Sequence, residues 1–255
     1  MKTIVCSDPD DLAERAALHL IKTVNAKPDL TLCLPTGKSP QLIYKKLVAA
    51  YERKKVSFTA VNLFNLDEYV GMAEDDPASF RTYMKHHLLN LIDLPISQWD
   101  IPDGNAEDLE QEAARFDQAI ETSGGFDCIL LGVGTNGHIG FNEPGTSIGS
   151  RTHIAALSNA TLDANADDLA VTDKTPSTGI TIGIANILEA REVILVASGS
   201  SKALAIDSLL GDGSAFAWPV AALKNHPNLT VYLDNDAAAT RISQAGGQSK
   251  LEKSF

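Results

Sequence analysis

Short runs of apolar and β-branched residues alternate with longer segments that repeat apolar residues at helical spacing, and this alternation continues along most of the chain. In its first unit, a strand expected at residues 3–6 is followed by apolar residues four positions apart, at Leu12, Ala16, Leu20 and Val24. Such spacing puts the apolar side chains on one face of a helix. Strands that alternate with helices indicate a mostly parallel sheet with helices on both faces, so we predict a doubly wound α/β fold.

The other expected elements follow the same rule. Further strands are predicted at residues 30–34, 61–66, 127–133, 178–182, 192–197 and 229–233. Helices are predicted around residues 42–48, at 79–91 and 107–121, and from near residues 188, 201 and 235. No repeat, low-complexity tract or Pro/Ser-rich linker divides the 255 residues, and their 44% hydrophobic content can fill a sizeable core. We therefore expect a single domain spanning residues 1–255.

Residues 142–176 interrupt the alternation. This segment is rich in Gly, Ser, Thr, Asn and Asp and has only a brief strand-like run near residues 153–157. Loops much longer than about 12–15 residues in compact domains are usually functional or disordered. We expect the segment to form a lid over a binding site; the alternative is a surface excursion with no role.

Charge and composition restrict the partners. The formal net charge of −12 repels nucleic acid and anionic lipid, so an anionic ligand would need a local positive pocket. No apolar stretch approaches the roughly 20 residues that span a bilayer, and no signal peptide is recognisable. The three cysteines show no paired spacing and lie in or beside apolar runs. These features predict a cytoplasmic protein that binds neither nucleic acid nor membrane, so the expected partner is a small molecule. They do not distinguish a monomer from a homo-oligomer.

Four predicted turns follow strands and gather polar residues, at 35–39, 67–68, 134–143 and 198–202. In open α/β sheets the ligand crevice lies at the carboxyl ends of the strands. The first and last of these turns combine small residues with a lysine before a helix, which favours phosphate binding at the helix N-terminus. Candidate binding residues are Thr36, Gly37, Lys38, Ser39 and Lys202. Neither turn has P-loop spacing, and each also fits an ordinary turn with a solvated lysine.

The other two turns carry groups that can transfer protons. Asp67 follows an apolar strand, where burial would raise its pKa and make it a general base; capping of the next helix by Asp67 or Glu68 is an equal alternative. His138 lies in a glycine-flanked turn between Asn136 and Glu143, and a carboxylate in reach would fix its tautomer. A structural histidine is the commoner case for a single residue. No second ligand spacing accompanies His138, so no metal site is predicted.

Several stretches of the chain resemble one enzyme family. They are LPTG (34–37), FNLDEYVG (64–71), GVGTNGHIGFNEP (132–144), SRT (150–152) and GSSKAL (199–204). Through them nearly the whole chain resembles the glucosamine-6-phosphate deaminase family. The related 6-phosphogluconolactonases share the Gly-His turn but typically have Asp-Glu-Arg in place of residues 67–69, and they lack an Asn-Glu-Pro such as residues 142–144.

The resemblance implies a modified Rossmann-like sheet and an isomerising deamination of glucosamine 6-phosphate in amino sugar metabolism, a hydrolase reaction on a C–N bond. His138, supported by Asn136 and Glu143, would move the proton that opens the pyranose ring. Asp67 would carry the C2 proton to C1 through an enolamine, and water would then release ammonia and leave fructose 6-phosphate. Lys202 and the two glycine-rich turns would hold the phosphate, with no cofactor and no metal.

Three positions depart from the family pattern. Some members have Asp where this chain has Asn136, which would leave more of the ring opening to Glu143. Allosteric members have cationic residues at the two positions where this chain has His153 and Ala155, so activation by N-acetylglucosamine 6-phosphate is not expected. Many members carry a phosphate-binding arginine where this chain has Ala-Asp-Asp at residues 166–168. Lys38, where the family often has glycine, is predicted to compensate.

Three other functions are alternatives. Galactosamine 6-phosphate differs from the gluco substrate only at C4 and would give tagatose 6-phosphate. A 6-phosphogluconolactonase-like hydrolase would need no proton transfer at C2, and the sequence at residues 67–69 disfavours it. A non-enzymatic sugar-phosphate sensor would have no reason to keep Asp67, His138 and Glu143 together.

Overall fold

A parallel sheet of seven strands runs through the protein in the order β1-β10-β9-β6-β2-β3-β5. The computed structural model describes residues 1–164, 166–172, 175–211 and 218–239, apart from the side chains of residues 163, 164, 167 and 168. The strands of this sheet are β1 (Lys2–Cys6), β2 (Thr31–Leu34), β3 (Asn62–Asn65), β5 (Trp99–Asp100), β6 (Cys128–Leu131), β9 (Val193–Ala197) and β10 (Leu229–Asp234). From β2 the chain adds β3 and β5 on one side, and from β6 it adds β9 and β10 on the other. The predicted doubly wound fold is confirmed, with its switch point between β2 and β6.

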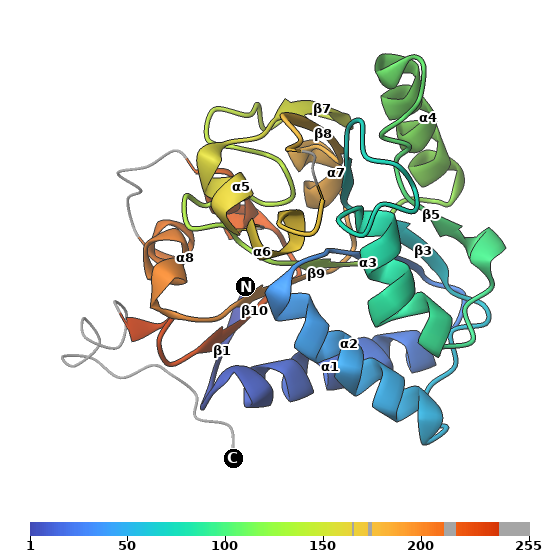
Figure 1. Ribbon diagram of the computed structural model, residues 1–255. Coiled ribbons are helices and arrows are strands. Elements are labelled where there is room, and N and C mark those ends of the chain that lie inside the picture. Colours follow the sequence, from blue (N-terminus) through green and yellow to red (C-terminus); the bar gives the residue numbers. More distant parts are fainter. Residues whose placement is uncertain (165, 173–174, 212–217, 240–255) are drawn as a thin grey trace.

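Helices cover both faces of this sheet (Figure 1). They are α1 (Pro9–Ala26), α2 (Lys38–Glu52), α3 (Phe80–His87), α4 (Leu109–Thr122), α5 (Asn159–Ala164), α6 (Ala166–Leu169), α7 (Ile184–Leu188), α8 (Ala203–Leu210) and the 3-10 helices η1 (Leu89–Leu91), η2 (Ile96–Gln98), η3 (Ser200–Lys202) and η4 (Pro219–Asn225). Helices α1, α2 and α3 contribute to one apolar core, whereas α4, α7, α8 and η4 contribute to the other. Alternate residues of the central strands serve the two cores, as a strand buried on both faces requires.

The first helix shows how the local sequence sets an element. The Asp8 side chain accepts hydrogen bonds from the N–H groups of Asp10 and Asp11, both at 2.9 Å, and Pro9 opens the helix. The apolar face predicted from the four-residue spacing is the face that is buried. The cysteines are core residues as well, and all three are buried and free. No helix in the described part of the chain has the length and apolar character to cross a membrane.

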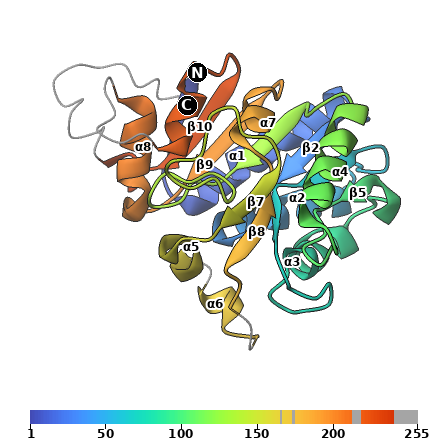
Figure 2. The same ribbon diagram turned by 90° about the horizontal axis from the view of Figure 1, so that it is seen from above.

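A second, antiparallel sheet lies beside the first, in the order β4 (Asp67–Tyr69), β8 (Thr178–Thr181), β7 (His153–Ala156). Figure 2 shows β7 and β8 side by side, with α5 and α6 beyond one end of the pair. The strand predicted at residues 178–182 is confirmed as β8, but it pairs antiparallel in this small sheet and is not part of the parallel sheet. Residues 67–68, expected as a turn, are part of strand β4, in which Asp67 pairs with Thr181.

Other predicted boundaries also need correction. A helix was expected to begin near residue 188, but α7 ends there, and it begins after Gly183, whose N–H donates to Asn186 Oδ1 at 3.0 Å. The helix predicted at 79–91 is α3 followed by η1. The two are separated at Leu88, whose φ of −143° departs from the helical value and ends the α-helix. The edge strand β5 was not expected. Most of the helix predicted from residue 235 lies outside the described residues, and residues 235–238 form a turn.

Candidate active site

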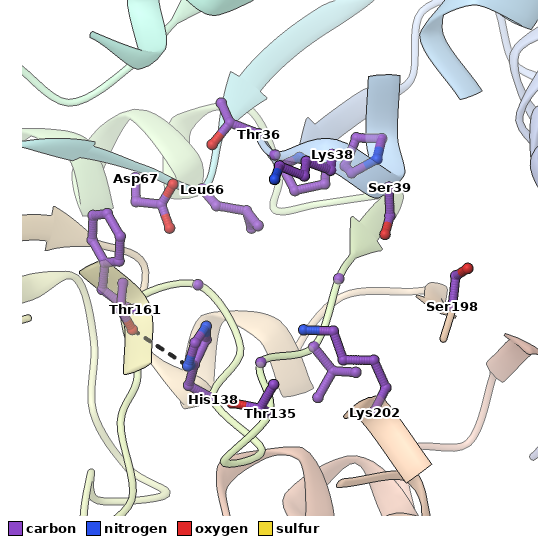
Figure 3. A pocket seen from close by; sticks show the side chains of 18 of the residues that line it. Thr36, Lys38, Ser39, Leu66, Asp67, Thr135, His138, Thr161, Ser198 and Lys202 are labelled. Atoms are coloured by element: carbon purple, nitrogen blue, oxygen red, sulfur yellow. Dashed lines mark hydrogen bonds between the residues drawn. The ribbon is translucent and has the colours of Figure 1, made fainter. Parts of the chain in front are cut away.

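The four polar turns meet in one cavity of about 550 Å³ at the carboxyl ends of β2, β3, β6 and β9. These strands are neighbours on either side of the switch point, which is where a doubly wound sheet opens a ligand crevice. Most of the predicted site residues line the cavity: Thr36, Gly37, Lys38, Ser39, Asp67, His138 and Lys202 (Figure 3). Asn136 and Glu143 are not part of its wall; they contact each other behind His138.

Asp67 is a buried carboxylate on the cavity wall, with 5% of its surface exposed. Burial raises its pKa well above the ordinary value, and the neighbouring charge of Glu68 adds to the shift. A carboxylate with a raised pKa is a stronger base when ionised, and removal of a C–H proton requires a strong base.

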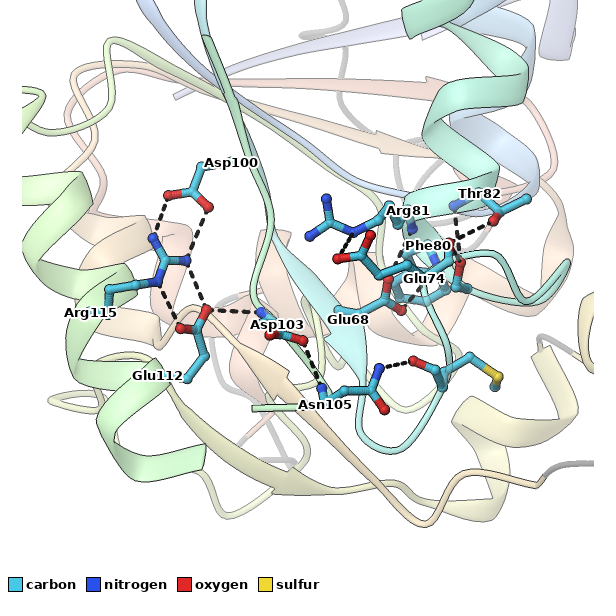
Figure 4. A network of polar contacts seen from close by, with 12 residues as sticks. Glu68, Glu74, Phe80, Arg81, Thr82, Asp100, Asp103, Asn105, Glu112 and Arg115 are labelled. Carbon is cyan, nitrogen blue, oxygen red and sulfur yellow. Dashed lines mark hydrogen bonds and ion pairs between the residues drawn. The ribbon is translucent and has the colours of Figure 1, made fainter. Parts of the chain in front are cut away.

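Glu68, and not Asp67, is the carboxylate that contacts the start of the next helix. Its carboxylate accepts from the N–H groups of Tyr69 (2.8 Å), Phe80 (3.0 Å) and Arg81 (2.9 Å), so it holds the first turn of α3 (Figure 4). Burial raises the pKa of Glu68 to about 7, although these donors oppose the shift. Ser79 is the N-cap of α3 and accepts from the Thr82 N–H, so Glu68 supports the start of the helix without being its cap, and Asp67 faces the cavity.

His138 has its tautomer fixed by the amide of Asn136. The Asn136 Nδ2 atom donates to Glu143 Oε2 at 2.7 Å, because a carboxylate only accepts. Asn136 Oδ1 therefore faces His138 Nδ1 at 2.7 Å, and Nδ1 must carry the proton that it donates. This leaves Nε2 of the imidazole with its lone pair, ready to accept a proton. The Asn136 amide therefore links His138 to Glu143 through two hydrogen bonds.

Electrostatics keep His138 neutral and Glu143 charged. Burial lowers the pKa of His138; Glu143, whose carboxylate lies 3.9 Å from Nδ1, opposes this change, and Lys202 adds to it. Burial would raise the pKa of Glu143, but hydrogen bonds from Thr161, Ser158 and Asn136 outweigh it and hold the pKa below its ordinary value. A neutral imidazole backed by a carboxylate can take a proton and stabilise the resulting imidazolium.

Gly134 makes room for this histidine. A Cβ atom added at Gly134 would lie 2.1 Å from Cε1 and 2.2 Å from Nδ1 of the His138 ring. The imidazole therefore packs directly on the backbone of the strand-to-turn junction, and any side chain at position 134 would displace it. Glycine is therefore required at position 134 on steric grounds, which the spacing of the glycines in the sequence did not reveal.

The first glycine-rich turn opens onto the cavity at the start of α2. Gly37 is the N-cap residue, and no side chain of the described residues caps this helix. The first N–H groups of a helix have no partner within it, and the helix dipole adds partial positive charge there. This end of α2 is therefore suited to an anion.

The second turn is fixed by a residue that the sequence analysis did not single out. Asp234, at the end of β10, accepts from Ser198 Oγ (2.6 Å) and from the Gly199 N–H (2.9 Å). The Gly199 N–H is therefore bonded to Asp234, and a phosphate at this turn would need other donors. The contribution of this turn to the cavity comes from Ser198, Ser201 and Lys202. Burial lowers the pKa of Lys202.

Two residues of the expected lid also contact the site. Ser158 Oγ donates to Glu143 Oε1 at 2.7 Å, and Thr161 Oγ1 donates to the same oxygen and lies 3.4 Å from His138 Nδ1. Thr161 also lines the cavity. Within the segment 142–176, strand β7 is firmly paired with β8, so the segment is not a structureless loop. The side chains of Asp167 and Asp168 lie outside the described residues.

This fold and site define a class of enzymes that act on sugar phosphates. The sequence profile described as "Glucosamine-6-phosphate isomerases/6-phosphogluconolactonase" matches residues 7–232. Within this class, the chain belongs to the glucosamine-6-phosphate deaminase family. Enzymes of that name from Bacillus velezensis and Bacillus subtilis are 43% and 41% identical to it, over 93% and 94% of this chain and 99% and 100% of their own length.

Solved structures agree with this assignment. A monomeric glucosamine-6-phosphate deaminase superposes with a TM-score of 0.90 at 40% identity, over 94% of this chain and 99% of that one. A 6-phosphogluconolactonase from Trypanosoma brucei reaches a TM-score of 0.74 at 20% identity, over 94% of this chain and 98% of that one. The second likeness shows a shared fold alone.

Proposed function

We propose that the protein converts glucosamine 6-phosphate and water into fructose 6-phosphate and ammonia. The observation that carries this proposal is the presence, in one cavity, of a buried carboxylate, Asp67, and a histidine of fixed tautomer, His138. One group suits proton removal from carbon and the other suits proton transfer between oxygens. Relatives named as glucosamine-6-phosphate deaminases, at about 40% identity over full length, support the same reaction.

Ring opening is the first step of the proposed reaction. The free Nε2 of His138 takes the proton of the C1 hydroxyl and delivers it to the ring oxygen, so that the C1–O5 bond breaks and the aldehyde forms. Glu143, through Asn136, stabilises the imidazolium that exists between the two transfers.

Proton transfer between carbons follows. Asp67 removes the C2 proton to give the enolamine and returns a proton to C1, which leaves an iminium at C2. Water adds to C2, the C–N bond breaks, ammonia leaves and the ketone of fructose 6-phosphate remains. The carboxylate is regenerated, so the reaction consumes no cofactor. The apolar side chains of Leu66, Phe80 and Phe141 line the cavity beside Asp67 and limit water during the enolamine stage.

The phosphate end of the substrate belongs at the two glycine-rich turns. Figure 3 shows Lys38 and Lys202 on opposite sides of the cavity, with Asp67 and His138 beyond them. We propose that the start of α2 with Thr36, Gly37 and Ser39 supplies backbone and hydroxyl donors, and that the two ammonium groups flank the phosphate.

Replacing Lys38 with Gln is expected to raise KM for glucosamine 6-phosphate about 10-fold or more, with a smaller change in kcat. The reason is that a charge-assisted hydrogen bond contributes about 1.5–3 kcal/mol and acts equally before and during the reaction. Steady-state ammonia release measures both constants. Lys45→Gln, an exposed lysine of the same helix, is the matched control. An unchanged KM in the Lys38 variant would remove this residue from the phosphate site.

We also propose that residues 142–176 include a lid whose moving part is α5 and α6. Because β7 is already hydrogen-bonded to β8, saturation with fructose 6-phosphate should slow amide exchange in α5 and α6 and leave β7 unchanged. Mass spectrometry of exchanged peptides measures this. Equal exchange with and without the ligand would favour a surface segment with no role in closure.

The state and location of the protein are part of the same proposal. The solved relative at 40% identity is described as monomeric, so we propose that this chain, as one domain over residues 1–255, is active as a monomer. The cytoplasm is the proposed compartment because the three cysteines are free and buried.

An ammonia assay on glucosamine 6-phosphate and galactosamine 6-phosphate, with identification of the ketose, tests the function. Fructose 6-phosphate from the gluco epimer is the expected result, and a preference for the galacto epimer, giving tagatose 6-phosphate, would change the substrate but keep the mechanism. Ring hydrolysis of 6-phosphogluconolactone without ammonia release from either amino sugar would show a lactonase instead. Binding without turnover of any of them would indicate a sensor.

A further inference from the structure

Two tyrosine hydroxyls hold the first glycine-rich turn from the protein side. Tyr44 Oη donates to the carbonyl of Pro35, and Tyr83 Oη donates to the carbonyl of Gly37 at 2.6 Å. The two rings pack edge to face, with centroids 6.5 Å apart. Tyr44 belongs to α2 itself, whereas Tyr83 reaches the turn from α3.

We infer that Tyr83 is a positioning residue that sets the Gly37–Lys38 peptide in the direction needed for phosphate binding. The inference rests on the proposed function, since it assumes that the phosphate lies at this turn. Neither tyrosine lines the cavity, although Gly37 and Lys38 do. The tyrosine hydroxyls therefore bind the two carbonyl oxygens on the side of the turn that faces away from the ligand.

The geometry of the peptide bond carries the argument. In a planar trans peptide, the carbonyl of one residue and the N–H of the next point in opposite directions. The hydrogen bond from Tyr83 to the Gly37 carbonyl therefore directs the Lys38 N–H away from α3 and toward the cavity. Tyr44 does the same for the Thr36 N–H through the carbonyl of Pro35. With the carbonyls held back, an anion at this turn meets donors and is not repelled by carbonyl oxygens.

Helix α3 can act as this support because its own first turn is held. Glu68 accepts from the N–H groups of Phe80 and Arg81 (Figure 4). Tyr83 follows two residues later in the same helix. Glu68 is next in sequence to Asp67. One short helix thus connects the strand that carries the proposed base with the turn that receives the phosphate, and it fixes their separation.

The Tyr83→Phe variant tests this role, because it removes the hydroxyl and keeps the ring. Loss of one orienting hydrogen bond should raise KM for glucosamine 6-phosphate and the inhibition constant of inorganic phosphate together, each about 3- to 10-fold. The value of kcat should stay within about 2-fold, since the bond acts on substrate and transition state alike. Tyr51→Phe, near the other end of α2, is the matched control and should change neither constant.

The outcomes separate this inference from the proposed function. Parallel rises in both constants at an unchanged kcat support the positioning role. Unchanged constants overturn it, as does a fall in kcat alone, which would show that α3 acts on Asp67 and not on the phosphate turn. Titration calorimetry with inorganic phosphate gives the same comparison if the wild-type protein releases no ammonia. A wild-type protein that releases ammonia but binds no inorganic phosphate would overturn the inference and leave the proposed function standing.

Discussion

Asp67→Asn should reduce kcat for ammonia release by about three orders of magnitude, in line with the roughly 10²–10⁴-fold that a positioned acid or base contributes. The amide keeps the size of the carboxylate but cannot take the C2 proton. Inhibition by inorganic phosphate should be nearly unchanged, because the residues proposed to bind phosphate lie at other turns of the cavity. Steady-state assays with phosphate as competitive inhibitor measure both quantities.

The control for this variant is Asp75→Asn, an exposed carboxylate in the loop that follows β4. It removes the same charge without reaching the cavity. Turnover close to that of the wild-type protein in the Asp67 variant would assign the C2 proton to another group. Equal losses of turnover and of phosphate inhibition would instead indicate a damaged cavity.

His138→Gln should lower kcat on cyclic glucosamine 6-phosphate by at least about 100-fold, since glutamine cannot transfer a proton between O1 and the ring oxygen. Exchange of the C1 protons of fructose 6-phosphate with deuterated water in the presence of ammonium should fall much less. That exchange depends on Asp67 acting on an open chain and does not require ring opening by His138. Nuclear magnetic resonance follows the exchange and an ammonia assay follows the forward reaction.

Equal losses in the two assays would place His138 in the proton transfer between carbons. The companion variant is Asn136→Asp, which restores the carboxylate found at this position in some members of the family. It keeps an acceptor for His138 Nδ1 but places a second carboxylate near Glu143, so it should raise the pKa of His138 above that of the wild-type protein. A fall of forward activity at the acid side of the pH profile is then expected to begin at higher pH than in the wild-type protein, because more of the imidazole is protonated there.

Much of the site could be predicted because it follows from strand order. Polar turns at the carboxyl ends of parallel strands converge near a switch point, and four such turns were visible in the sequence. Their local contents, such as the glycines around His138, could also be recognised. Both features depend on residues that are close in sequence.

The remaining parts depend on partners that are distant in sequence. The N–H groups of Phe80 and Arg81 donate to Glu68 and not to Asp67. The predicted span of their helix did not show which of the two carboxylates would reach it. The pairing of β4 with β8 joins segments more than a hundred residues apart, so the small sheet could not be inferred from periodicity. Asp234 supports the second turn from the neighbouring strand, and no local spacing reveals that contact.

In the proposed mechanism, ammonia is released only after Asp67 has removed the proton from C2. Glucosamine 6-phosphate deuterated at C2 tests it most directly, with the product examined by nuclear magnetic resonance. The expected products are fructose 6-phosphate and ammonia in equal amounts, with the deuterium at C1 or in the solvent. No such transfer is expected in the Asp67→Asn variant. An aldose 6-phosphate that keeps its deuterium at C2, or unchanged transfer in that variant, would contradict it.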